Sequence, residues 1–211
     1  MLRGTIPVVL LSLLYVFPTS AMGAGVVHSD AMTICSIIIN EMTEGKISGD
    51  KAKEISMAIA LAGNKHFGRV TCGDMWLYMA IVHVESGFRN NIINSQNCRG
   101  MFQVHAPSWA SKFGLRYIDL LDLNTNADCG IRVFKYYLEQ YKSLVPTLSA
   151  YNSDHPRAAT GYARAVLGTR RKIQKRYAEL YKAFKDEHRI ASNPPVPQPS
   201  PTDAQDAPQS P

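Results

Sequence analysis

The sequence predicts an all-α domain, and three observations support this fold class. Apolar residues recur at helical spacing through most of the 211-residue chain. Capping residues and glycines divide that pattern into segments of helical length. No strand-rich region or internal repeat interrupts it. The pattern covers residues 30–188, which is long enough for one domain with its own core.

Residues 1–24 are expected to form a signal peptide that precedes this domain. Arg3 supplies a positive start, an apolar run follows from Ile6 to Phe17, and small residues occupy positions 21–24. The apolar run is shorter than the roughly 20 residues that span a membrane comfortably. An uncleaved anchor is the alternative. We therefore expect an exported, periplasmic protein with no stable membrane span in its mature chain.

The first part of the domain is expected to form three helices. Gly63 and Gly87 stand where the second and third should end, and Asp74 is the expected N-cap of the third. Apolar side chains spread around most of the third helix, so we expect it to be buried on most sides. The expected ranges are 31–43, the stretch from the cap at Ser48 to Gly63, and 75–85.

The second part is expected to contain an extended turn at 100–104 and then further helices. Gly114 ends a short helix, and the polar cluster at 124–126 is expected to cap the long one that follows. Gly168 is expected to split the last helical stretch in two. The expected helices are 109–113, 127–142, 147–152, 157–167 and 169–188.

The composition changes near the C-terminus. Residues 193–211 are rich in Pro, Ser, Gln and Ala, with no large apolar residue beyond Val196. Such a segment buries too little apolar surface to fold. Residues 190–211 are therefore expected to be a disordered or polyproline-like tail.

The four cysteines all follow the signal peptide. An even number in an exported chain favours disulfides, and four cysteines allow three pairings. We prefer Cys35 with Cys72 and Cys98 with Cys129, because each pair closes a local loop. No Cys-x-x-Cys or His-x-x-x-His spacing occurs, so a zinc site has little support.

The chain is basic, with 23 Lys and Arg against 17 Asp and Glu. Removing Arg3 with the signal peptide leaves 22 minus 17, or +5. Nucleic acid and a polyanionic cell envelope are both targets for such a surface. Export favours the envelope, so we expect no nucleic-acid partner; a solvated helix face would need no partner at all. The excess lies late in the chain, at Arg164, Arg170, Arg171, Lys172, Lys175, Arg176, Lys182 and Lys185.

Glu85 is the candidate catalytic residue. It follows an apolar run at the expected end of a helix, and Phe88 and Met101 are candidates for enclosing it. Burial raises the pKa of a carboxyl group, and a protonated carboxyl can deliver a proton to a poor leaving group such as a glycosidic oxygen. A surface glutamate at a helix end is the alternative. The uncharged, amide-rich loop at 90–97 suits a neutral, hydroxyl-rich ligand.

Four segments together resemble the soluble lytic transglycosylase family, which shares the goose-type lysozyme core. Each is weak evidence alone, but their order and spacing match that family over about residues 74–168. The resemblance implies a lysozyme-like lytic transglycosylase domain that acts on peptidoglycan without a metal or organic cofactor. The segments are Glu85-Ser86-Gly87-Phe88, Gly100-Met101-Phe102-Gln103, Ala150-Tyr151-Asn152 and, more weakly, Gly161-Tyr162-Ala163-Arg164-Ala165-Val166.

What the resemblance implies is cleavage between N-acetylmuramic acid and N-acetylglucosamine with a 1,6-anhydro product. In the family one Glu acts first as acid and then as base, and Glu85 matches it. By the same resemblance, Ser86 lies near the N-acetyl or leaving group, and Met101 and Gln103 line the reactive subsite. The remaining matches would hold the sugar and orient the Glu: Tyr151, Asn152 and, from the next helix, Tyr162.

Asp154 marks a departure from the family, which more often has Ala-Gly after Tyr-Asn. If Asp154 faces the cleft, a hydrolytic muramidase becomes the alternative outcome, because a two-carboxylate glycosidase needs a second acid. A turn or cap role is the other interpretation. A non-catalytic peptidoglycan-binding or assembly protein is the competitor from another class.

The small domain and Pro-rich tail suggest a specialised enzyme. We expect it to open the wall locally for a secretion, conjugation or pilus machine. The tail or the basic last helix would then recruit a component of that apparatus.

Overall fold

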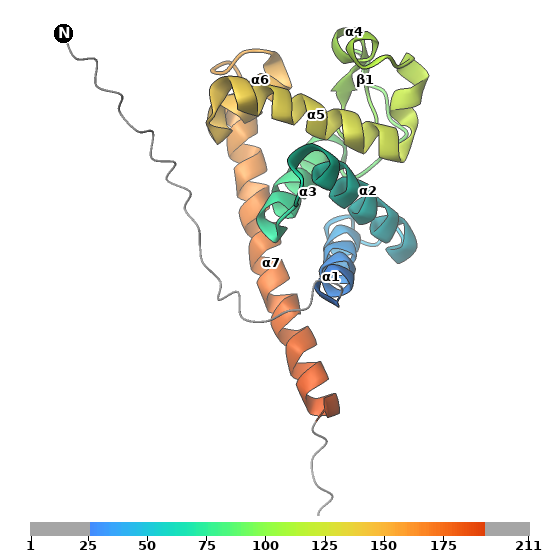
Figure 1. The fold of residues 1–211 in the computed structure, drawn as a ribbon, viewed down its shortest axis with the longest axis vertical. Helices are drawn as coiled ribbons and strands as arrows, with labels where there is room; N and C mark the ends of the chain where they lie inside the picture. The colour runs from blue at the N-terminus through green and yellow to red at the C-terminus, as the bar shows by residue number, and fades with distance from the viewer. Residues whose placement is uncertain (1–25, 193–211) are drawn as a thin grey trace, which may run out of the picture.

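The computed structural model describes the backbone of residues 26–192 and the side chains of residues 30–187. Its described part is almost entirely helical, which confirms the all-α prediction (Figure 1). The predicted signal peptide lies outside the described residues, as does the predicted tail beyond Ser192. The elements are α1 (Val26–Met42), α2 (Gly49–Phe67), α3 (Cys72–Ser86), β1 (Cys98–Arg99), β2 (Val104–His105), α4 (Ala106–Trp109), η1 (Ser111–Phe113), η2 (Tyr117–Leu121), α5 (Leu123–Tyr141), α6 (Leu144–Ser153) and α7 (Thr160–Ser192).

Helix α3 lies in the middle of the core, as its sequence predicts. The stretch from Met79 to Val82 is fully buried. Helix α7 packs along α3 and also contacts α1 and α6, while α5 packs against α2 and α6. Figure 1 shows α5 crossing the molecule below α4 and β1, and α7 extending from near α6 past α3 and α1. Within residues 26–192, no helix combines the length and apolarity needed to cross a membrane.

The boundaries of α2 and α3 differ from the prediction. Helix α2 continues through Gly63 to Phe67 and ends at Gly68. A side chain at Gly63 would meet Val70 at 2.3 Å, so this glycine permits close packing rather than ending a helix. The N-cap of α3 is Thr71, and the predicted cap Asp74 is its partner three residues later in a capping box.

Two further predictions about the helices were wrong. The side chain that caps α5 is Asp122, which accepts from the amide of Thr125. Helix α7 is continuous through Gly168. A glycine inside a helix costs only about 1 kcal/mol, and burial of Val166 and Ile173 on either side outweighs that cost.

The segment between α3 and α4 is held by the side chain of Asn126 on α5. Its Nδ2 donates to the carbonyls of Arg99 and Leu120, and its Oδ1 accepts from the amide of Phe102, all at 2.8 Å. The predicted extended turn is therefore a two-stranded antiparallel hairpin, β1 with β2, tied to α5. Gly100 has a φ of 72°, and a side chain there would meet Asn126 at 2.1 Å.

The predicted disulfides are not present, because all four cysteines are free thiols. Cys98 lines the pocket that also contains Glu85, and Cys129 lines a second pocket. Cys72 donates to the hydroxyl of Tyr177 at 3.7 Å. Burial raises the pKa of Cys35 to about 12, and nearby Cys72 adds to the rise.

Candidate active site

Glu85 lies in the last turn of α3, where the helix meets the loop. Gly87 ends the helix in the left-handed conformation, with a φ of 59°, and its amide donates to the carbonyl of His83 at 2.9 Å. Phe88 follows, also at positive φ, with its ring 1% exposed and packed against His83. This turn leaves Glu85 half-buried on an otherwise apolar helix.

Tyr162, in the first turn of α7, holds the carboxyl group of Glu85. Its hydroxyl donates to Oε1 of Glu85 at 2.7 Å. Burial raises the pKa of Glu85 from its ordinary value of 4.5 to about 7, and the Tyr162 hydrogen bond works in the opposite direction. Burial also raises the pKa of Tyr162 well above its usual range, with Glu85 adding to the rise. The phenol thus stays a donor when Glu85 ionises.

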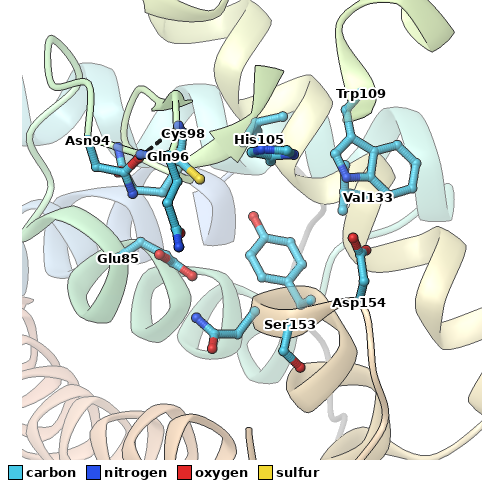
Figure 2. A pocket seen from close by; sticks show the side chains of 13 residues that line it. Glu85, Asn94, Gln96, Cys98, His105, Trp109, Val133, Ser153 and Asp154 are labelled. Atoms are coloured by element: carbon cyan, nitrogen blue, oxygen red, sulfur yellow. Dashed lines mark hydrogen bonds between the residues drawn. The ribbon is translucent and has the colours of Figure 1, made fainter. Parts of the chain in front are cut away.

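A cleft of about 530 Å³ opens beside Glu85. In Figure 2, Asn94, Gln96 and Cys98 lie on the Glu85 side, and Trp109, Val133 and Asp154 lie on the opposite side. The cleft thus collects residues from α3, the hairpin loop, α4, α5 and α6. The full lining is Glu85, Asn94, Gln96, Cys98, Gln103, Val104, His105, Trp109, Val133, Tyr151, Asn152, Ser153 and Asp154.

Among its described residues, the lining contains one histidine, His105, and no Lys or Arg. It offers four amide side chains, which both donate and accept hydrogen bonds, and two carboxyl groups, Glu85 and Asp154. Since no Lys or Arg faces Glu85, nothing in the lining lowers its pKa by charge attraction. Nor do residues 26–192 gather three or more His, Cys, Asp or Glu side chains in a way that could hold a metal ion. The arrangement suits proton transfer to a neutral polar ligand.

The floor of the cleft depends on Tyr151 and Gln103. The hydroxyl of Tyr151 donates to the carbonyl of Phe102 at 2.9 Å, whereas Tyr162 is the residue that bonds Glu85. Gln103 has a φ of 46°, a strained conformation for a residue other than glycine. Its Nε2 donates back to the carbonyl of Gly100 at 2.8 Å.

Two predicted site residues do not line the cleft. Ser86 is 3% exposed, and its hydroxyl donates to the carbonyl of Val82 within α3. Met101 is fully buried in the core. A helical hydroxyl near a catalytic residue often bonds the preceding turn, and the sequence motif does not reveal this. Of the other candidates, Glu85, Gln103, Tyr151 and Asn152 share the cleft, and Tyr162 reaches it by bonding Glu85.

Several lining residues were not singled out from the sequence. Trp109 and Val133 come from helices, where their spacing marks them as core residues, and both are nearly buried. His105 follows the Gln103 motif, and its Nδ1 shares a hydrogen bond with Ser108 at 2.7 Å. Asn94 and Gln96 belong to the amide-rich loop at 90–97, which the sequence predicts to suit a neutral, hydroxyl-rich ligand, although neither residue was named individually. Asp154 lines the cleft and also ends α6.

Comparison with known protein families places this geometry in context. The family model described as "Transglycosylase SLT domain" matches residues 73–184, which is 112 of the 211 residues. The matched segment begins in the first turn of α3 and ends within α7, so it contains every residue of the cleft. Comparisons with curated proteins and with solved structures gave no match.

Proposed function

The chain belongs to the transglycosylase SLT domain family of peptidoglycan lytic transglycosylases, and from that premise we propose how its cleft acts. The bond cleaved is the β-1,4 linkage from N-acetylmuramic acid to N-acetylglucosamine. The product ends in 1,6-anhydro-N-acetylmuramic acid, and Glu85 is both the general acid and the general base. The observation that carries this proposal is the half-buried Glu85, whose pKa is raised to about 7 beside a cleft with no Lys or Arg among its described lining residues.

The proposed reaction needs one proton, which Glu85 first gives and then recovers. Protonated Glu85 transfers its proton to the glycosidic oxygen as the bond from C1 to that oxygen breaks. The muramoyl C6 hydroxyl then forms a bond to C1, and its proton passes to the Glu85 carboxylate. No water is consumed, and Glu85 ends in its starting state. A pKa near 7 suits both steps, because acid and base forms are both accessible near neutral pH.

The neighbours of Glu85 support this cycle in different ways. Tyr162 keeps donating to Oε1 in both protonation states and so fixes the carboxyl orientation. Gln103 and Asn152 offer amide groups to sugar hydroxyls and N-acetyl groups. Tyr151 acts as a positioning residue through the Phe102 carbonyl. Ser86 and Met101 support the site from the core side, where they are buried.

Mass spectrometry of the muropeptides released from purified sacculi tests the proposal. Wild type should release anhydro-muropeptides, and Glu85→Gln should lower the rate at least 1,000-fold, because the amide keeps the shape but has no proton to transfer. Glu139→Gln, on the exposed side of α5 away from the cleft, is the matched control and should keep full activity. Anhydro products from Glu85→Gln at the wild-type rate would contradict the mechanism.

A hydrolytic muramidase is the second candidate, and the position of Asp154 in the same cleft is its specific support. Water would then attack C1 in place of the C6 hydroxyl. The two outcomes differ in their products: hydrolysis leaves reducing ends, and transglycosylation leaves anhydro ends. Release of neither product by wild type would favour the third candidate, a peptidoglycan-binding or assembly protein.

We also propose that this envelope enzyme opens the wall locally for a secretion, conjugation or pilus machine. The support is its small domain together with the basic outer face of α7, which comprises the exposed side chains Arg164, Arg171, Lys175, Lys182 and Lys185. A truncation of residues 193–211, which leaves α7 whole, should impair assembly of the machine and keep the purified activity unchanged. Loss of purified activity on truncation would contradict this role for the tail.

A further inference from the structure

The second carboxyl group of the cleft lies at the end away from Glu85. Figure 2 shows Asp154 near Trp109 and Val133, on the side opposite Glu85, Gln96 and Cys98. A carboxyl group in this place faces a part of the bound polymer other than the bond that reacts. Asp154 is therefore better placed to bind the substrate than to assist Glu85.

The backbone and one hydrogen bond hold Asp154 in place. Its φ is 55°, the left-handed conformation that ends α6, and its amide donates to the carbonyl of Ala150 at 2.8 Å. The buried hydroxyl of Tyr137, on α5, donates to Oδ1. Within the described part of the chain no group is recorded as bonding Oδ2. One oxygen is thus anchored and the other is open to the cleft.

Among residues 30–187, no positive side chain forms an ion pair with this carboxylate. None of the described residues lining the cleft is Lys or Arg. Its titratable neighbours in the lining are His105 and Tyr151. The amide side chains of the cleft already serve neutral hydroxyl and N-acetyl groups. A carboxylate forms its strongest hydrogen bonds with a charged donor such as an ammonium group, because charge attraction then adds to the hydrogen bond.

We infer that Asp154 forms a subsite for a protonated amino group of the bound peptidoglycan. This inference rests on the proposed function for its substrate. Two parts of the polymer carry such a group: a glucosamine ring that lacks its acetyl group, and the diamino residue of a stem peptide. Either ammonium group would donate to Oδ2 of Asp154 while Tyr137 holds Oδ1.

A binding experiment on the Glu85→Gln protein tests the subsite without turnover. In that variant, Asp154 is the one remaining carboxyl group among the described lining residues. The probes are the tetramers of glucosamine and of N-acetylglucosamine, titrated by calorimetry at a pH where the sugar amine is protonated. Adding Asp154→Asn should weaken binding of the glucosamine tetramer about three- to tenfold, the range for a charge-assisted bond at an exposed site. Binding of the acetylated tetramer should change less than twofold.

Asparagine is the sharpest substitution here, because it tolerates the left-handed conformation and its amide oxygen still accepts from Tyr137. Asp186→Asn, on the exposed part of α7, is the control for loss of one negative charge. It should leave the affinity of both tetramers unchanged. An equal effect of Asp154→Asn on the two tetramers would show a structural role and overturn a sugar-amine subsite.

A second pair of substrates separates the stem-peptide source from the sugar source. Strands that carry stem peptides are compared with the same strands after acetylation of the peptide amines, and kcat/KM is measured for wild type and Asp154→Asn. A preference for free amines in wild type that is lost in Asp154→Asn identifies the peptide. If Asp154→Asn leaves the ratio of rates and both tetramer affinities unchanged, the inference is wrong. If the proposed function is wrong, wild type should instead release no anhydro product from any strand. That outcome does not depend on the affinities measured for the tetramers.

Discussion

The cleft and the outer face of α7 use charge in opposite ways. The cleft presents amides and two carboxyl groups, whereas the outer face of α7 carries a row of basic side chains spaced by seven, four, seven and three residues. Positions with that spacing share one face of a helix. Within the described part of the chain none of them has an acidic partner, although Arg176 on the same helix bonds Glu41 and Glu179. The row comprises Arg164, Arg171, Lys175, Lys182 and Lys185, all exposed.

This difference shows how a basic protein can keep cations away from the Glu85 carboxyl group, whose pKa is raised to about 7. A cation close to Glu85 would favour the carboxylate and lower its pKa. The row lies on the far side of α7 from Tyr162, which points from the same helix toward Glu85. A basic outer surface and a raised pKa at Glu85 can therefore coexist in one domain. The predictions below test this separation, from the largest expected effect to the smallest.

The largest effect is on stability, and it comes from the buried charge of Glu85 itself. The pKa of Glu85 rises from 4.5 to about 7 on folding. Wild type should therefore lose roughly 3 kcal/mol of unfolding free energy as the pH rises from about 4.5 to 7, because the unfolded chain ionises first. Glu85→Gln lacks this loss. Urea unfolding of both proteins should give similar stabilities at pH 4.5 and a more stable Gln variant at pH 8. If the unfolding free energies of wild type and Glu85→Gln changed with pH in parallel, the raised pKa of Glu85 would be contradicted.

Tyr162→Phe removes the one hydrogen bond recorded for the Glu85 carboxyl group. Because that bond favours the carboxylate, its loss should raise the pKa of Glu85 further. We expect the alkaline limb of the kcat/KM profile to move up by about one pH unit and the maximal rate to fall about tenfold. Tyr177→Phe, at another buried tyrosine of α7, is the control and should leave the profile in place. A lower rate with an unmoved profile would mean a purely structural role.

Gln96→Lys breaks the separation directly by placing a cation on the Glu85 side of the cleft. Attraction between the two charges should lower the pKa of Glu85 by about half a unit to one unit, since the lysine would be exposed and partly screened. At neutral pH the rate should fall severalfold and recover at lower pH. Gln96→Met removes the amide without adding charge, so any loss it causes should not depend on pH in this way. If the rate of the Lys variant had the same pH dependence as that of the Met variant, charge attraction at Glu85 would be ruled out.

Neutralising the outer face of α7 should change catalysis least. In a triple variant, with Arg171, Lys175 and Lys182 each changed to Gln, the rate on short glycan fragments should stay within twofold of wild type. Its rate on whole sacculi should lose part of its salt dependence, because fewer charges face an anionic polymer. Three changes to Gln at Lys46, Lys51 and Lys53, exposed residues around the start of α2, form the control. Equal effects of the two triples would show that only net charge matters.

The sequence predicts the helices of this protein better than it predicts their ends. Periodicity and burial agree for α3, where the fully buried stretch was expected. The end of α2 and the continuity of α7 were missed, since a glycine that ends a helix and a glycine that permits close packing look alike in a sequence. The cap of α5 was missed for a related reason: Asp122 and the cluster at 124–126 are all good capping residues.

The candidate site was predictable where local motifs position residues and unpredictable where tertiary contacts do. The motifs pointed to Glu85, Gln103 and Tyr151, and the structure places all three at the cleft. Ser86 lies next to Glu85 in sequence, yet a helix turns adjacent residues by about 100°, so its hydroxyl points into α3. The part played by Asn126 depends on contacts 6 to 27 residues away, which no local pattern encodes.

The three hydrogen bonds of Asn126 also determine how the catalytic segment unfolds. The amide of Phe102 belongs to a short hairpin, which alone would exchange its hydrogens with solvent quickly. That amide donates to Asn126 on α5. It can therefore exchange only when α5 unfolds locally or when the hydrogen bond to the Asn126 side chain breaks. Its exchange with deuterium should therefore follow the slow amides of α5 rather than those of the neighbouring loop, and the cleft floor and α5 should open as one cooperative unit.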